Sequence, residues 1–233
     1  ELIARAEKSG GRECFRHGGR SVTFAELKDI SLRLASGLAE AGVGRGDRVA
    51  IYLPNCPEYI FAYCAIFALG AIAVPLDFFL GEDEVAAFLN HAEAHTLIST
   101  RRGRVSLEGL PVRVPSLSRV IVREEEAGEF LSFGGMLSAA RGEPPEIALA
   151  EDDHAAIFYT SGSTGRPKGA LWNRRHLHLG ADAAHAAIGI DETFFSLAAI
   201  PFSHSAGILY PALAVRYGMR FLIMERFSPL EFV

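Results

Sequence analysis

The sequence is poor in the residues that mark disulfide-bonded, metal-binding and nucleic-acid-binding proteins. Its 233 residues include three cysteines, Cys14, Cys56 and Cys64, an odd number without the spacing of a metal site. Because Cys56 and Cys64 stand among apolar neighbours, we expect reduced, buried thiols in a cytoplasmic protein. The formal net charge is −5, whereas binding to a phosphate backbone requires a basic surface. We therefore expect no nucleic-acid partner.

The chain also lacks an uninterrupted membrane-spanning run. Residues 59–76 carry no charge and approach the length of a transmembrane helix, but Gly70 and Pro75 divide them. Asn55 is placed to cap a helix that has a proline in its first turn and ends at Gly70. Residues 71–74 then have the character of a buried strand. We predict a buried helix followed by a core strand, and no transmembrane segment.

One motif carries most of the chemical information that the chain does contain. Residues 159–169, which we call the phosphate loop, read Tyr-Thr-Ser-Gly-Ser-Thr-Gly-Arg-Pro-Lys-Gly. Glycines let the backbone approach a ligand closely, hydroxyls both donate and accept hydrogen bonds, and Lys168 adds a positive charge. This combination predicts a loop that surrounds phosphate oxygens with N–H, O–H and ammonium groups. The candidate binding residues are Thr160, Ser161, Gly162, Ser163, Thr164, Gly165 and Lys168.

The order of residues excludes two better-known phosphate-binding motifs. A Walker loop needs Gly-Lys-Ser/Thr running into a helix, and here Pro167 precedes Lys168 and Gly169 follows it. Pro167 also disfavours helical angles at Arg166, so we expect the loop to join two strands. No Gly-x-Gly-x-x-Gly dinucleotide fingerprint is present. A solvated glycine–serine linker is the alternative, and the strand-like flanks disfavour it.

Helices and strands alternate along the chain, which predicts an α/β fold of stacked, mostly parallel sheets flanked by helices. The capping box Thr23-x-x-Glu26 begins a helix that Gly42 ends. A proline pair marks a linker, so we predict a first α/β subdomain over 1–145 and the incomplete start of a second, with the phosphate loop, over 146–233. The expected strands are 48–53, 71–74, 96–100, 120–122, 155–159, 195–200 and 220–224, and the expected helices are 57–69, 82–92, 133–141, one that Asn173 caps, and 207–217.

The phosphate loop resembles the signature of the adenylate-forming (AMP-binding) superfamily, which includes acyl-CoA synthetases, aryl-CoA ligases, firefly-type luciferases and peptide-synthetase adenylation domains. Residues 41–50, 53–59 and 69–76 resemble the opening of such enzymes. Residues 201–207, Pro-Phe-Ser-His-Ser-Ala-Gly, resemble their substrate-gate segment, and we call them the gate segment. The resemblance implies part of a large N-terminal domain without its C-terminal lid. We expect residues 1–233 alone to be inactive.

The resemblance also implies an activity and roles for individual residues. ATP activates a carboxylic acid, fatty or aromatic, to an acyl-adenylate, and coenzyme A then takes the acyl group. Lys168 would neutralise the departing pyrophosphate, or alternatively would hold the loop by pairing with a downstream carboxylate. His204 would act beside the acyl pocket and the adenylate phosphate, and Thr164 would be a ligand of Mg²⁺. The implied substrate contacts are Phe202, His204 and Ser205.

The chain departs from the resembled pattern after the phosphate loop. Such enzymes commonly continue into a Thr-His or Ser-His pair, where this chain has Asn173-Arg174 behind Trp172. Asn173 still caps a helix, and Trp172 either lines a pocket or fills the core. Three other activities stay open: loading of an acyl carrier protein, a luciferase-like oxygenase, and a non-catalytic nucleotide-binding module. A homodimer is also left open.

Overall fold

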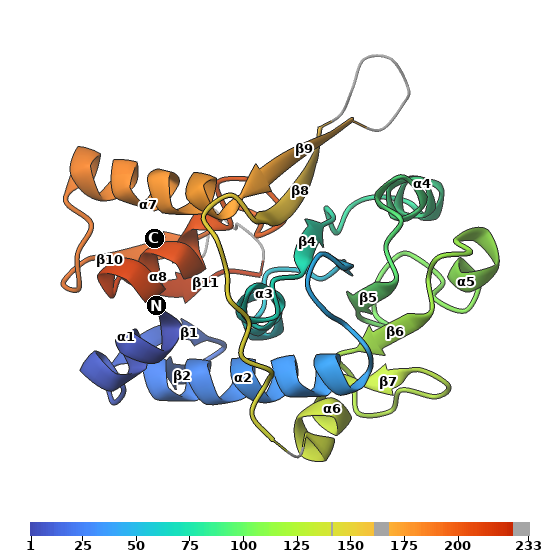
Figure 1. Ribbon diagram of the computed structural model, residues 1–233, viewed down its shortest axis with the longest axis horizontal. Helices are drawn as coiled ribbons and strands as arrows, with labels where there is room; N and C mark the ends of the chain where they lie inside the picture. Colours follow the sequence, from blue (N-terminus) through green and yellow to red (C-terminus); the bar gives the residue numbers. More distant parts are fainter. Residues whose placement is uncertain (141, 161–167, 226–233) are drawn as a thin grey trace.

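The computed structural model of the protein describes residues 1–140, 142–160 and 168–225. Two β-sheets are flanked by helices, and α3 (Pro57–Ala68) lies between them (Figure 1). This arrangement confirms the predicted α/β fold.

The larger sheet has seven strands, and its central strands are almost completely buried. Neighbouring strands are parallel except at one edge, where β8 and β9 run antiparallel. Parallel strands covered on both faces are continuous apolar runs in sequence, which is why this sheet was predictable. In spatial order its strands are β7 (Leu131–Ser132), β6 (Arg119–Val122), β5 (Thr96–Ser99), β3 (Arg48–Ile51), β4 (Ile72–Pro75), β8 (His154–Thr160) and β9 (Lys168–Asn173).

The smaller sheet joins strands from the two ends of the described chain. β1 and β2 form an antiparallel hairpin, and β1 pairs in parallel with β11, where Phe15 faces Phe221. In spatial order the strands are β10 (Phe195–Ala198), β11 (Arg220–Ile223), β1 (Glu13–His17) and β2 (Arg20–Thr23).

Both sheets contain strands from each side of residue 145. β8 and β9 join the larger sheet, and β1 and β2 join the smaller one. The boundary predicted near residue 145 therefore does not separate the two sheets. The assignment of 1–145 and 146–233 as subdomains stays a prediction.

Helix α3 occupies the main hydrophobic core, which includes side chains from both sheets. Tyr59, Ile60 and Tyr63 are fully buried, which confirms the predicted buried helix before strand β4. Among the helices of the described residues, none has both the length and the apolar character to cross a membrane. The other helices are α1 (Leu2–Ser9), α2 (Phe24–Glu40), α4 (Glu82–Ala92), α5 (Leu110–Arg113), α6 (Phe133–Ala139), α7 (Arg174–Ile188) and α8 (Leu209–Tyr217).

Two predicted helix caps have different outcomes. The capping box of α2 is present, since Thr23 Oγ1 accepts a hydrogen bond from the Glu26 amide at 3.2 Å and Glu26 Oε2 accepts one from the Thr23 amide at 2.8 Å. The predicted cap of α3 is wrong, because the N-cap is Cys56 and makes no side-chain cap bond. The Asn55 amide instead donates to the carbonyl of Ile200, 145 positions further along the chain.

Candidate active site

The phosphate loop stands at the end of the β8–β9 hairpin. Thr160 pairs with Lys168 in the last step of the antiparallel ladder, and Tyr159 pairs with Gly169. The loop thus joins two strands, as predicted, and does not lead into a helix as a Walker loop does. The predicted phosphate ligands between these strands lie outside the described residues: Ser161, Gly162, Ser163, Thr164 and Gly165.

The loop leaves the sheet at an edge suited to ligand binding. Because β8 runs parallel to β4, the loop begins at the edge where the parallel strands β3, β4 and β5 have their carboxyl ends. Open α/β sheets place their ligands at this edge. The hairpin therefore ends where such sheets bind ligands, and phosphate binding by the loop stays a prediction.

The far side of the loop is built from Lys168 and Gly169. A Cβ atom at Gly169 would lie 2.6 Å from Ile157 Cγ2, so a side chain here would require the Ile157 side chain to move. The Lys168 side chain is exposed. Among the described residues, no carboxylate forms an ion pair with Lys168, and both of its predicted roles stay predictions.

Tyr159 anchors the near side of the loop to helix α4. Its ring stacks on Phe88 at 4.4 Å between centroids, with an interplanar angle of 9°. Its hydroxyl lies 2.9 Å from His91 Nδ1 and 3.3 Å from the Phe88 carbonyl oxygen. Burial raises the pKa of Tyr159 to about 12, so the hydroxyl remains a neutral donor at neutral pH. Sequence reasoning did not assign this role, although Tyr159 is the first residue of the motif.

Trp172 is half-buried at the edge of the core. Its ring meets Phe158 edge to face at 5.0 Å between centroids, and it packs against the main hydrophobic core. Asn173 caps α7 as predicted, since its side chain accepts a hydrogen bond from the His176 amide at 3.1 Å.

The gate segment turns tightly between β10 and α8. The His204 amide donates to the Pro201 carbonyl at 2.9 Å, and the Gly207 amide donates to the His204 carbonyl at 2.8 Å. His204 Nδ1 accepts a hydrogen bond from the Ala206 amide at 3.1 Å, so Nε2 carries the proton of the neutral ring. The His204 side chain is exposed and Ser205 is half-buried, so both are accessible to a ligand.

Phe202 does not fit its predicted role as a substrate contact. Its side chain is fully buried and packs edge to face against Tyr59 and Tyr210. The motif alone does not say which way each side chain points, and this aromatic ring packs into the core. We therefore assign Phe202 to the packing of the gate segment.

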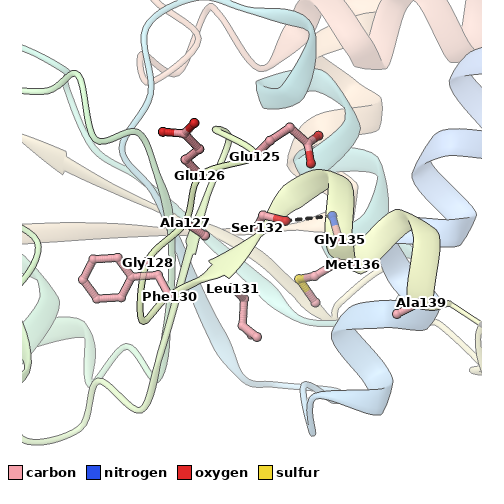
Figure 2. Close-up of a pocket in the computed structure, with 10 residues that line it drawn as sticks. All are labelled: Glu125, Glu126, Ala127, Gly128, Phe130, Leu131, Ser132, Gly135, Met136 and Ala139. Carbon is pink, nitrogen blue, oxygen red and sulfur yellow. Dashed lines mark hydrogen bonds between the residues drawn. The ribbon is translucent and has the colours of Figure 1, made fainter.

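A separate hollow lies at the opposite end of the larger sheet (Figure 2). It has a volume of about 510 Å³ between the loop after β6, strand β7 and helix α6. Phe130, Leu131 and Met136 supply much of its lining, and Glu125 and Glu126 lie beside it. With two carboxylates and no basic group in its lining, this hollow is unsuited to a phosphate.

The described residues contain no group of three or more histidine, cysteine or acidic side chains that could hold a metal ion. All three cysteines are unpaired. Cys14 and Cys56 are buried as predicted, and Cys64 is half-buried. Desolvation raises the pKa of all three thiols well above the ordinary value.

A glycine- and hydroxyl-rich loop at the carboxyl edge of a parallel sheet is the arrangement of a nucleotide-binding α/β protein. The model of the AMP-binding enzyme family matches residues 2–233, and the chain belongs to this family.

Several similar proteins are named as CoA ligases or CoA synthases. The chain is 37% identical over 214 residues to a feruloyl-CoA synthase from Amycolatopsis, covering 88% of this chain and 39% of that protein. It is 27% identical over 239 residues to 4-coumarate–CoA ligase 1 from Petroselinum crispum, covering 97% and 42%. The chain thus spans about two-fifths of the length of these relatives.

Solved structures of two further ligases share the fold. A long-chain-fatty-acid–CoA ligase from Archaeoglobus fulgidus superposes with a TM-score of 0.86 at 26% identity, over 97% of this chain and 46% of that one. The o-succinylbenzoate coenzyme A synthetase from Bacillus subtilis, solved with ATP and magnesium ion, gives 0.81 at 27% identity, over 99% and 58%.

Proposed function

We propose that the protein activates a carboxylic acid with ATP and transfers the acyl group to coenzyme A. The observation that carries this proposal is the β8–β9 hairpin, which presents the phosphate loop of an AMP-binding enzyme at the carboxyl edge of a parallel sheet. The names of the similar ligases support the same reaction class.

In the proposed first step, a carboxylate oxygen of the acid attacks the α-phosphorus of ATP. The bond from the α-phosphorus to the bridging oxygen breaks, and pyrophosphate leaves with its electron pair. Such a reaction depends on positioning and charge stabilisation more than on covalent participation by the protein. The loop residues 160–165 would hold the β- and γ-phosphates, and the ammonium of Lys168 would stabilise the charge on the leaving pyrophosphate.

Mg²⁺ takes oxygen ligands, and it usually binds through one or two protein groups and the phosphates of the nucleotide. The hydroxyl of Thr164 is such an oxygen donor, so the residue type fits the predicted ligand. When bound, the ion neutralises phosphate charge.

His204 and Ser205 would contact the acid and the adenylate. The hydrogen bond from the Ala206 amide to His204 Nδ1 directs the Nε2–H of the exposed ring outward, where it can donate to a phosphate or carboxylate oxygen. In the proposed second step, the thiolate sulfur of coenzyme A attacks the acyl carbon, and AMP leaves.

The acid is proposed to be aromatic or fatty. Two relatives are named for feruloyl and 4-coumarate substrates, and another, from Mycobacterium tuberculosis, for a long-chain fatty acid. The proposal includes a C-terminal lid from the remainder of the polypeptide, which the greater length of the relatives supports, and a homodimer stays open. A cytoplasmic location is also proposed, on the strength of the three unpaired cysteines.

The test is an assay of AMP release by the natural full-length chain. A panel of hydroxycinnamic, benzoic and fatty acids is supplied with ATP and Mg²⁺, with and without coenzyme A. AMP release that requires both an acid and coenzyme A is expected for at least one aromatic or fatty acid. Acid-dependent pyrophosphate release without coenzyme A turnover would favour a carrier protein as acceptor. Light emission or oxygen uptake would favour a luciferase-like oxygenase, and nucleotide binding without turnover would favour a non-catalytic module.

A further inference from the structure

Asn55 joins the carboxyl end of β3 to three points of the smaller sheet and its connections. Its side-chain amide nitrogen, which has two hydrogens to donate, lies 3.0 Å from the carbonyl oxygen of Ile200, 3.2 Å from that of Met224 and 3.4 Å from that of Ala198. Its side-chain oxygen accepts from the Phe202 amide at 2.8 Å. The residue is 7% exposed, so water does not replace these bonds easily. Each is a long-range contact, separated by 143 to 169 positions in sequence.

Tyr63 holds the other main-chain group of Phe202. Its hydroxyl donates to the Phe202 carbonyl at 2.7 Å, and the bond is buried. Phe202 lies outside any strand or helix, where buried peptide groups have no ladder partner. Asn55 and Tyr63 therefore supply hydrogen-bond partners for the N–H and the C=O of Phe202, in place of the partners that a strand or helix would supply.

This clamp on Phe202 determines the place of His204. Only one residue lies between them, and the turn is closed by the bond from the His204 amide to the Pro201 carbonyl. The turn is packed so closely that a Cβ added at Gly207 would lie 2.1 Å from the Pro201 carbonyl oxygen. The turn thus transmits a displacement of Phe202 directly to the His204 ring.

Asn55 also belongs to the edge of the larger sheet that carries the phosphate loop. It follows β3, and the loop follows β8, two strands away in the order β3-β4-β8. With a spacing of ~4.8 Å between neighbouring strands, the two strand ends are separated by ~10 Å across the sheet. Asn55 therefore follows a strand that ends at the same sheet edge as β8, and its side chain bonds the segment that carries His204.

We propose that Asn55 is a positioning residue for acyl-adenylate formation, holding the gate segment so that His204 faces the nucleotide bound by the phosphate loop. This role rests on the proposed function. Because Asn55 would set the position of the gate segment, its loss should affect the rate of adenylation and the binding of the acid more than the binding of ATP.

The experiment is a double-mutant cycle in the natural full-length chain, with acid-dependent ATP–pyrophosphate exchange as the readout. Asn55→Ala is expected to lower the exchange rate by up to ~100-fold, the effect of a misplacement of about 1 Å, while the KM for ATP changes less than about twofold. Because Asn55 acts through His204, Asn55→Ala is expected to cost little in a His204→Ala background, whereas independent effects would multiply.

Two further variants keep the test decisive if Asn55→Ala folds poorly. Tyr63→Phe removes only the second half of the clamp and should show the same lack of additivity with His204→Ala. Asn90→Ala is the matched control, since Asn90 also donates to two carbonyls, those of Ala86 and Arg113, and should leave exchange unchanged.

Hydrogen–deuterium exchange measured by mass spectrometry tests the positioning without any substrate. Asn55→Ala should speed exchange in the peptide that spans 200–208 and leave the 86–92 peptide of α4 unchanged. The positioning role would be overturned if the rate losses of Asn55→Ala and His204→Ala multiplied fully in the double variant. It would also be overturned if Asn55→Ala left the hydrogen–deuterium exchange of the 200–208 peptide unchanged. A wild-type protein inactive with every acid would instead overturn the proposed function, and the exchange of the 200–208 peptide would then decide the positioning separately.

Discussion

Replacing Gly207 by alanine should displace the gate segment and destabilise the protein. The new Cβ would lie 2.1 Å from the Pro201 carbonyl oxygen and 2.7 Å from Phe202 Cα, and real Cβ contacts shorter than 3.0 Å are essentially never seen. The contact with the oxygen must therefore open by about 0.9 Å. Both contacting atoms belong to main chain, and the peptide groups of Phe202 are held by Asn55 and Tyr63, so no flexible side chain can absorb the movement.

Two opposing effects set the size of the change. Forcing an extra methyl group into a packed site costs ~1–3 kcal/mol, and a clash with main chain belongs at the upper end. Alanine also restricts the unfolded chain, which stabilises the folded state by ~0.4–1 kcal/mol. The net loss is about 2 kcal/mol. At ~2–4 °C per kcal/mol for a unit of ~150–250 residues this lowers Tm by ~4–8 °C, and the fall is smaller if a longer chain unfolds as one unit.

Thermal unfolding of the natural full-length chain measures this change directly. Gly11→Ala is the control, since a Cβ at Gly11 meets nothing within 4 Å, and its Tm should stay at or slightly above that of the wild type. Acid-dependent ATP–pyrophosphate exchange should fall with Gly207→Ala because the clash with Pro201 and Phe202 displaces the turn that carries His204. Equal Tm values for the two variants would refute the argument from close packing.

Two further predictions concern the two sides of the phosphate loop. Tyr159→Phe removes the hydroxyl that meets His91 and the Phe88 carbonyl, so the KM for ATP should rise about fivefold, for a bond worth ~1 kcal/mol. Tyr217→Phe, whose lost hydroxyl bonds Asp182 instead, should leave the KM unchanged, and equal behaviour of both variants would contradict the anchor. Lys168→Ala should lower the rate of ATP–pyrophosphate exchange by ~100- to 1,000-fold, the usual effect of removing a group that stabilises transition-state charge. Lys168→Arg keeps the charge and should retain part of the rate. An unchanged exchange rate in the alanine variant would remove Lys168 from its proposed role.

Most of the larger sheet was predictable because each of its buried strands is marked by its own short stretch of sequence. Strands β3, β4 and β5 are short apolar runs between turn residues, and the structure places them within one or two residues of the expected bounds. Strands β1 and β2 were not predicted, because Glu13, Arg16 and Arg20 interrupt their apolar character. Their pairing with β11 depends on residues far away in the chain, which local patterns do not contain.

The candidate site shows the same division between local and long-range information. The residues around the phosphate loop predicted a strand on each side, and the β8–β9 hairpin confirms this. The local sequence predicted Asn55 as a helix cap, but its side chain hydrogen-bonds residues more than 140 positions away. Phe202 was assigned to the substrate because a motif gives residue types but not the direction in which each side chain points.

The parallel pairing of β1 with β11 has a consequence for synthesis on the ribosome. Phe15 meets Phe221, so about 200 further residues must be made before the first strand finds its neighbour. At ~5–20 residues per second, the β1–β2 hairpin waits ~10–40 s with one edge open to other chains. A nascent chain arrested before β11 should therefore present an unpaired strand edge, the kind of surface that chaperones shield.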